Sequence, residues 1–122
     1  MVQLIVGQKG KGKTTVILDK DSEHMFELNN KIRLINVSEY LISNSDEFIG
    51  FIAGIISQDH DLQSMYLDGF MKCAHLEGKD ITGTVLKLDK ISSAFNVNFV
   101  ISVSMDASDL DEKLKDKVLV AL

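Results

Sequence analysis

The sequence is poor in several residue types, and each shortage excludes a class of protein. Its 122 residues include no proline, no tryptophan and a single cysteine, Cys73, so no internal disulfide can form and nothing requires an oxidising compartment. No apolar run approaches the roughly 18–20 residues that cross a bilayer, and the first residues lack the basic region of a signal peptide. We therefore expect a soluble, cytoplasmic protein with no membrane span.

Positive charge is also in short supply. Thirteen Lys and Arg residues face 18 Asp and Glu residues, which gives a formal net charge of −5. This balance argues against a nucleic-acid binder driven by bulk charge. A hydrophobic content of 45% is typical of a folded chain, and no repeat or linker divides it. We expect residues 1–122 to form a single domain.

Apolar segments of strand length alternate with segments of helical periodicity. The expected strands are residues 2–6, 32–37, 65–67 and 97–103. The expected helices follow Ser45 as an N-cap, follow Asp80, and follow Ser108, which forms a variant capping box with Asp111 ahead of Leu110, Leu114 and Val118. This alternation predicts an α/β fold with a mostly parallel sheet of four or five strands, covered on both faces. For residues 118–122 three interpretations stay open: a helix end, an added edge strand or an oligomer contact.

A glycine-rich motif follows the first expected strand without a gap. It matches the pattern G-x-x-x-x-G-K-[ST] and consists of Gly7, Gln8, Lys9, Gly10, Lys11, Gly12, Lys13 and Thr14. Glycines let the backbone wrap a polyphosphate closely, and a following helix presents unpaired N–H groups. Lys13 would neutralise the β- and γ-phosphates, Thr14 would bind Mg²⁺, and Thr15 would extend the cradle. A chance match in a chain of this length has odds of roughly one in 250.

With this motif the chain resembles the P-loop NTPase superfamily. The motif covers eight residues, and the alternating pattern extends the likeness over most of the chain. The resemblance implies a three-layer α/β/α fold with the nucleotide at the carboxyl ends of the strands. The layout also looks like a set of small bacterial P-loop proteins that are sometimes labelled twitching-motility ATPases. No residue beyond the nucleotide motifs supports pilus retraction, so that label transfers no function.

The family also has a Walker B carboxylate at the end of an apolar strand, which holds Mg²⁺ through water. Two positions compete for this role here. Asp68 follows the short apolar segment 65–67, and Asp106 follows the longer strand but with polar residues before it. Chain order favours Asp68 and leaves the strand 97–103 for a later, sensor-like position.

The sequence departs from the family pattern at the residues that hydrolysis needs. Gly69, not Glu, follows Asp68, so the source of a catalytic base is open, with Asp19, Asp21 and Glu39 as candidates. Arg33 is the only arginine and falls inside an expected strand, which disfavours a nucleotide kinase. The positive charge of an arginine finger would therefore come from Lys9 or Lys11, come from a partner protein, or be absent.

The segment after the motif poses a geometric problem. A parallel β–α–β crossover needs a dozen or more residues, but residues 16–18 are Val-Ile-Leu followed by acids, as at the end of a strand. Three explanations stay open: the helix runs on through this segment, the first helix is drastically shortened, or the chain lacks a segment after Thr15. We favour the third.

We expect an Mg-ATP-binding protein that hydrolyses the γ-phosphate slowly. ATP is preferred over GTP because no N-K-x-D sequence is present. The alternative is a module that binds nucleotide or another anion without turnover and acts through a partner protein or a second copy of the chain.

Overall fold

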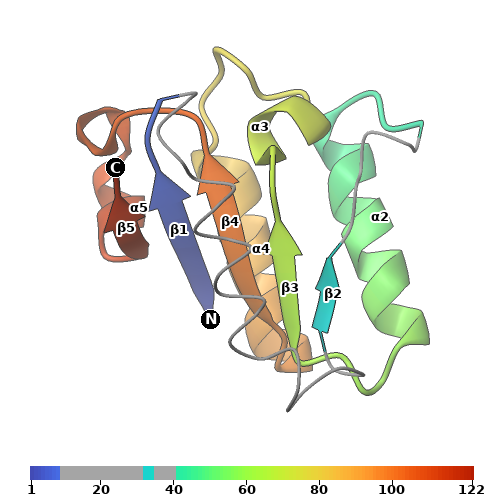
Figure 1. Ribbon diagram of the computed structural model, residues 1–122. Helices are drawn as coiled ribbons and strands as arrows, with labels where there is room; N and C mark the ends of the chain where they lie inside the picture. The colour runs from blue at the N-terminus through green and yellow to red at the C-terminus, as the bar shows by residue number, and fades with distance from the viewer. Residues whose placement is uncertain (9–31, 35–40) are drawn as a thin grey trace.

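The computed structural model describes residues 1–8, 32–34 and 41–122, and residues 32–34 by their backbone alone (Figure 1). The strands are β1 (Val2–Val6), β2 (Ile32–Leu34), β3 (Ser64–Leu67), β4 (Asn98–Val103) and β5 (Val118–Ala121). The helices are α2 (Ser45–Gln58), α3 (Phe70–Cys73), α4 (Thr82–Phe95), the 3₁₀ turn η2 (Ala107–Asp109) and α5 (Glu112–Lys115).

The strands form one sheet in the order β2-β3-β4-β1-β5, and every pairing is parallel. This confirms the predicted α/β fold with a parallel sheet. At its centre β1 pairs with β4, from Val2 opposite Phe99 to Val6 opposite Val103. Because all strands run the same way, their carboxyl ends meet at one edge, which we call the carboxyl edge (Figure 1).

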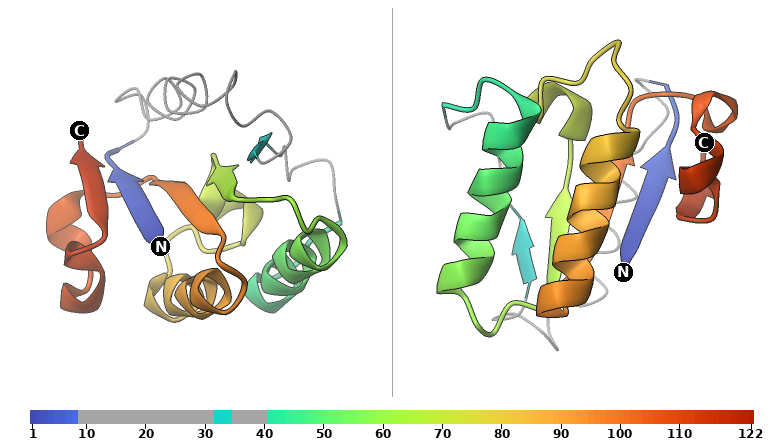
Figure 2. Two further views of the ribbon diagram at one scale, coloured as in Figure 1. Left: turned by 90° about the horizontal axis from the view of Figure 1, so that it is seen from below. Right: turned by 180° about the vertical axis from the view of Figure 1, so that it is seen from behind.

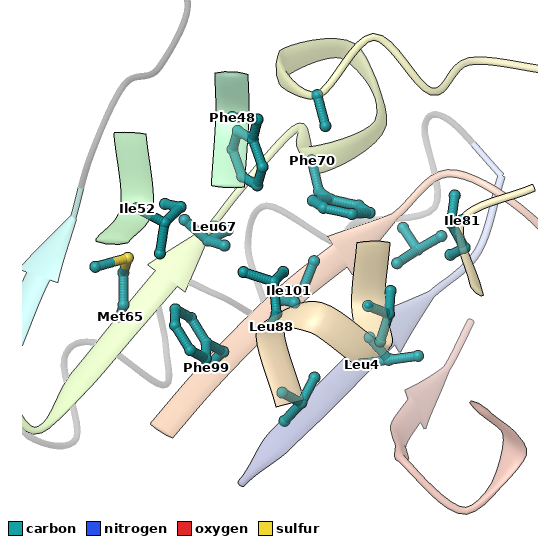
Figure 3. Packing of buried hydrophobic residues seen from close by; sticks show 14 of the residues in the cluster. Leu4, Phe48, Ile52, Met65, Leu67, Phe70, Ile81, Leu88, Phe99 and Ile101 are labelled. Carbon is teal, nitrogen blue, oxygen red and sulfur yellow. The ribbon is translucent and has the colours of Figure 1, made fainter. Parts of the chain in front are cut away.

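Helices α2, α3 and α4 pack on one face of the sheet, which we call the helix face (Figure 2). Side chains from these helices and from alternate strand positions fill the main core (Figure 3). The rings of Phe48 and Phe70 meet edge to face, with centroids 5.6 Å apart, a geometry that aromatic pairs favour. The largest fully buried side chains of this core are Phe48, Phe70, Phe99, Leu4, Ile52, Met65, Leu67, Ile81, Leu88 and Ile101.

The opposite face of the sheet has a smaller apolar cluster. Ile5, Tyr66 and Val100 are buried there, with Val120 packed against them. Buried apolar side chains on both faces are what a covered parallel sheet requires. The helix expected directly after the glycine-rich motif, which would belong to the third layer, lies outside the described residues.

The N-cap of helix α2 lies one residue before the predicted position. We expected Ser45 as the N-cap, but the cap is Asn44, whose side chain accepts a hydrogen bond from the Glu47 N–H at 2.9 Å. Glu47 in turn accepts the Ser43 N–H at 2.7 Å. Asn and Ser are comparable caps, and the reciprocal contact of Glu47 with Ser43 fits an N-cap at Asn44.

The helix predicted after Ser108 is present but shorter than expected, and it does not reach Val118. A 3₁₀ turn comes first, and α5 is only four residues long, with Asp111 as its N-cap accepting the Lys113 N–H at 2.9 Å. Val118 then enters β5, which pairs with β1. Hydrogen bonds from the exposed edge of β1 outweigh the helical periodicity of these residues, and the edge-strand interpretation of 118–122 is confirmed.

Helix α4 agrees with its prediction after Asp80. The Asp80 side chain accepts hydrogen bonds from the N–H and hydroxyl of Thr82, at 2.9 and 2.6 Å. The helix ends at Asn96, which adopts a left-handed conformation with φ of 55°, as helix ends commonly do. Among the helices in the described part of the chain, none is long and apolar enough to cross a membrane.

Candidate functional site

The glycine-rich motif starts at the carboxyl edge, directly after the central strand β1. Gly7 is buried, and its N–H donates to the carbonyl of Val103 at the end of β4, at 3.2 Å. Gln8, the next residue, is exposed. The chain therefore leaves the sheet at the position where the motif requires it.

The rest of the motif lies outside the described residues. This applies to Lys9, Gly10, Lys11, Gly12, Lys13, Thr14 and Thr15, and to the Val-Ile-Leu segment at 16–18. The phosphate cradle, the lysine, the Thr14 ligand and the three explanations for the short crossover stay predictions from the sequence.

Asp68 lies at the same edge, directly after β3, and is partly exposed. Its Oδ1 accepts a hydrogen bond from the hydroxyl of Ser102 at 2.9 Å. The same Ser102 oxygen accepts the N–H of Gly69 at 3.0 Å. One buried serine thus contacts both the side chain at position 68 and the backbone of the next residue.

Strand β4 separates the two ends of this candidate site. It pairs with β1 on one side and with β3 on the other. Neighbouring strands lie about 4.8 Å apart, so β1 and β3 run about 10 Å apart. Through β4, Gly7 is linked to Val103 and Asp68 to Ser102, so the spacing between the start of the motif and Asp68 is set by the sheet backbone.

Asp106, the alternative to Asp68, also follows a strand at the carboxyl edge. Its side chain is exposed, and its carbonyl accepts the Asp109 N–H at 3.0 Å as the 3₁₀ turn η2 begins. Asp106 therefore has the surroundings of a turn residue, whereas Asp68 is held by a buried hydroxyl.

Gly69 has a backbone conformation that suits glycine. Its φ is 67°, in the left-handed region, and a Cβ added there would meet no atom within 4 Å. A glutamate at this position would strain the backbone. The turn after Asp68 is therefore built without the carboxylate that many ATPases carry there. The substitutes named above, Asp19, Asp21 and Glu39, lie outside the described residues.

Arg33 lies in β2, as its expected strand placement requires, opposite Met65 of β3. Only its backbone is described. Its role as a source of positive charge for catalysis stays open.

Cys73 lies close to Asp68 without the properties of a nucleophile. The half-buried thiol is 4.0 Å from the Asp68 carbonyl oxygen. Burial raises the pKa of this thiol, and the Asp68 charge raises it further against the lowering effect of Lys72. A raised pKa keeps the sulfur protonated and unreactive at neutral pH.

A separate hollow of about 330 Å³ opens at the N-terminus of α4. Asp80, Asp109 and Asp111 line it together with Lys79. The hydroxyl of Thr82, followed by its N–H, lowers the pKa of the Asp80 carboxyl, with a smaller lowering effect from Lys113 against the raising effect of burial. Three carboxylates and one ammonium make this hollow unsuitable for a polyphosphate.

The described residues contain no group of three or more His, Cys, Asp or Glu side chains that could hold a metal ion. The predicted magnesium ligands stay a prediction, because Thr14 lies outside that part of the chain and Asp68 is a single carboxylate. The segment Asp59-His60-Asp61 forms a turn after α2.

Sequence analysis missed the contact of Ser102 with Asp68. The clue was present: a serine interrupts the apolar strand β4 at a position that alternates with Ile101 and Val103 of the main core. Without the strand order, nothing connected that serine to Asp68.

No protein-family model matches this chain, and no curated protein matches it significantly.

Proposed function

We propose that this protein binds Mg-ATP at the carboxyl edge and hydrolyses it slowly. The observation that carries the proposal is the placement of the glycine-rich motif, which starts at Gly7 directly after the buried central strand β1. A motif of this pattern in a strand–loop context is typical of phosphate binding. Asp68 follows β3, which β4 separates from β1, and supplies a partly exposed carboxylate at the same edge.

Each residue has a separate role in this proposal. The backbone N–H groups of the loop form the phosphate cradle. The loop residues are Gly7, Gln8, Lys9, Gly10, Lys11, Gly12 and Lys13, and Thr15 lies beside them. The Lys13 ammonium neutralises charge on the β- and γ-phosphates. Thr14 and Asp68 are the residues that would hold Mg²⁺, which supplies further charge neutralisation when bound. A carboxylate about 10 Å from β1 is within the reach of a triphosphate and its hydrated cation.

The residue that follows Asp68 favours slow ATP hydrolysis. Gly69 provides no carboxylate to activate water, and the sequence has one arginine for charge at the γ-phosphate. The same observation supports the second candidate function, a module that binds nucleotide without hydrolysis and acts through a partner protein or a second copy.

Nucleotide binding is tested by thermal unfolding with and without Mg-ATP. A ligand that binds only the folded state at 100 times its Kd stabilises it by about 2.7 kcal/mol, so the wild-type melting temperature rises. Lys13→Ala should lose most of that rise. Lys90→Ala removes the same charge from an exposed position of α4 and should keep the full rise. Equal rises in wild type and Lys13→Ala would contradict the proposed loop.

Phosphate release separates the two candidate functions. The proposed ATPase releases phosphate at a low rate that Lys13→Ala abolishes, whereas the binding module gives a melting shift and no release. Release that survives Lys13→Ala indicates a contaminant. Parallel titrations with ATP and GTP, each with and without Mg²⁺, measure the base preference and the contribution of the cation.

A further inference from the structure

Ser102 is a polar side chain in an apolar strand. It is 3% exposed and belongs to β4, between the strand that precedes the glycine-rich motif and the strand that ends at Asp68. Its neighbours in the strand, Ile101 and Val103, point into the main core, so its hydroxyl lies on the opposite face. Burying a hydroxyl is costly unless it is hydrogen-bonded, and this one makes two bonds, both to the turn after β3.

The two hydrogen bonds have a direction that suits a carboxylate. The hydroxyl has one proton to donate, and Asp68 Oδ1 receives it at 2.9 Å. The Gly69 N–H donates to the same oxygen atom of Ser102 at 3.0 Å, which fixes where the hydroxyl oxygen lies. Hydrogen bonds to an ionised group are stronger than neutral ones, and low local polarity strengthens them further.

We propose that Ser102 is a positioning residue for Asp68. It holds the carboxylate in the orientation in which Asp68 contributes to the Mg²⁺ of the bound nucleotide, and it ties that orientation to the left-handed turn at Gly69. This inference rests on the proposed function. Residues that orient a metal ligand typically change metal affinity by 10–100-fold when they are removed.

The central test compares ATP affinity with and without Mg²⁺. In wild type, Mg²⁺ should tighten ATP binding, and Asp68→Asn should remove most of that gain. Ser102→Ala should reduce the gain about tenfold while leaving the Mg²⁺-free Kd within about twofold. Ser102→Thr keeps a hydroxyl and should retain most of the gain.

Two further variants separate positioning from general stability. Ser92→Ala removes another buried serine hydroxyl, 1% exposed, from α4 near the amino end of the sheet. It should leave the Mg²⁺ gain unchanged. The double variant Asp68→Asn/Ser102→Ala should be no worse than Asp68→Asn alone, because Ser102 acts through Asp68.

A readout without nucleotide checks the geometry itself. Amide exchange at Gly69, measured by NMR on the free protein, should accelerate in Ser102→Ala and stay near the wild-type rate in Ser102→Thr and Ser92→Ala. If Ser102→Ala unfolds, Ser102→Cys replaces it in the ATP-affinity and amide-exchange measurements. The cysteine side chain has a similar volume, and its thiol is a weaker hydrogen-bond donor than the hydroxyl.

The outcomes distinguish failure of this inference from failure of the proposed function. Wild type that binds no nucleotide overturns the proposed function and this inference with it. If Asp68→Asn loses the Mg²⁺-dependent gain in ATP affinity but Ser102→Ala keeps it, the positioning role alone is overturned. Losses that add fully in the double variant overturn it as well, because Ser102 would then act independently of Asp68.

Discussion

The two faces of β4 differ in what they contribute. On the helix face, Phe99, Ile101 and Val103 belong to the main apolar core. On the opposite face, Val100 belongs to the small second cluster, and Ser102 at the carboxyl edge contacts the turn after β3. One strand thus combines a stabilising face with a face that ends in polar contacts, and alternation of side chains along the strand keeps them apart.

The largest expected effect is on stability and comes from the helix face. Phe99→Ala empties a fully buried site and should lower the free energy of unfolding by about 3–5 kcal/mol. Val100→Ala, its neighbour on the opposite face, should cost about 1.5 kcal/mol at roughly 0.8 kcal/mol per buried carbon. Urea unfolding of both variants measures the difference. Equal costs would show that the two faces contribute alike.

A smaller effect is expected at the turn after Asp68. Gly69→Ala places a Cβ in the left-handed region and should cost about 1–2 kcal/mol. Gly78→Ala is a matched control, since its φ is 71° and its Cβ would also meet open space. Both should lose similar stability by urea unfolding, while Gly69→Ala alone should change the Mg²⁺ dependence of ATP binding. If Gly78→Ala also changed the Mg²⁺ dependence of ATP binding, that dependence would not be specific to the turn after Asp68.

The smallest expected effect is a pH dependence of the free energy of unfolding, which comes from the exposed start of α4. The Thr82 hydroxyl and N–H lower the pKa of the folded Asp80 carboxyl below 3.8. A lowered folded pKa contributes stability that is present above about pH 4 and is lost as the pH falls through the folded pKa. Wild type should therefore be more stable than Asp80→Ala at pH 7, with the gap closing below pH 3.8. Urea midpoints across pH 2.5–7 measure it, and a gap independent of pH would contradict the assignment.

The sequence predicted β1, β3 and β4 well because their apolar runs are bounded by turn residues. The strand expected at 32–37 is confirmed at 32–34, and its last three residues lie outside the described part of the chain. It missed the start of α2 because Asn44 and Ser45 are adjacent and cap equally well. It extended the helix after Ser108 too far because Leu110, Leu114 and Val118 have helical spacing, whereas Val118 pairs with the exposed edge of β1. A local pattern contains no information about such an edge.

For the candidate site, position along the chain favoured Asp68 but could not reveal its hydrogen bond with Ser102. Ser102 lies 34 residues from Asp68, and the two meet only because β3 and β4 are neighbours in the sheet. Strand order depends on the whole chain, so a pairing of this kind cannot be inferred from spacing or composition.

The pairing of Val2 with Phe99 has a consequence for how the protein is made. During synthesis the first strand leaves the ribosome long before its partner exists, and it cannot take its central place until β4 has followed. Closing so long a loop is entropically expensive, which favours slow folding. The start of the glycine-rich motif is translated before β4, yet its anchor in the sheet, the hydrogen bond from Gly7 to Val103, cannot form until β4 has followed. The proposed nucleotide binding should therefore require β4 to be synthesised first.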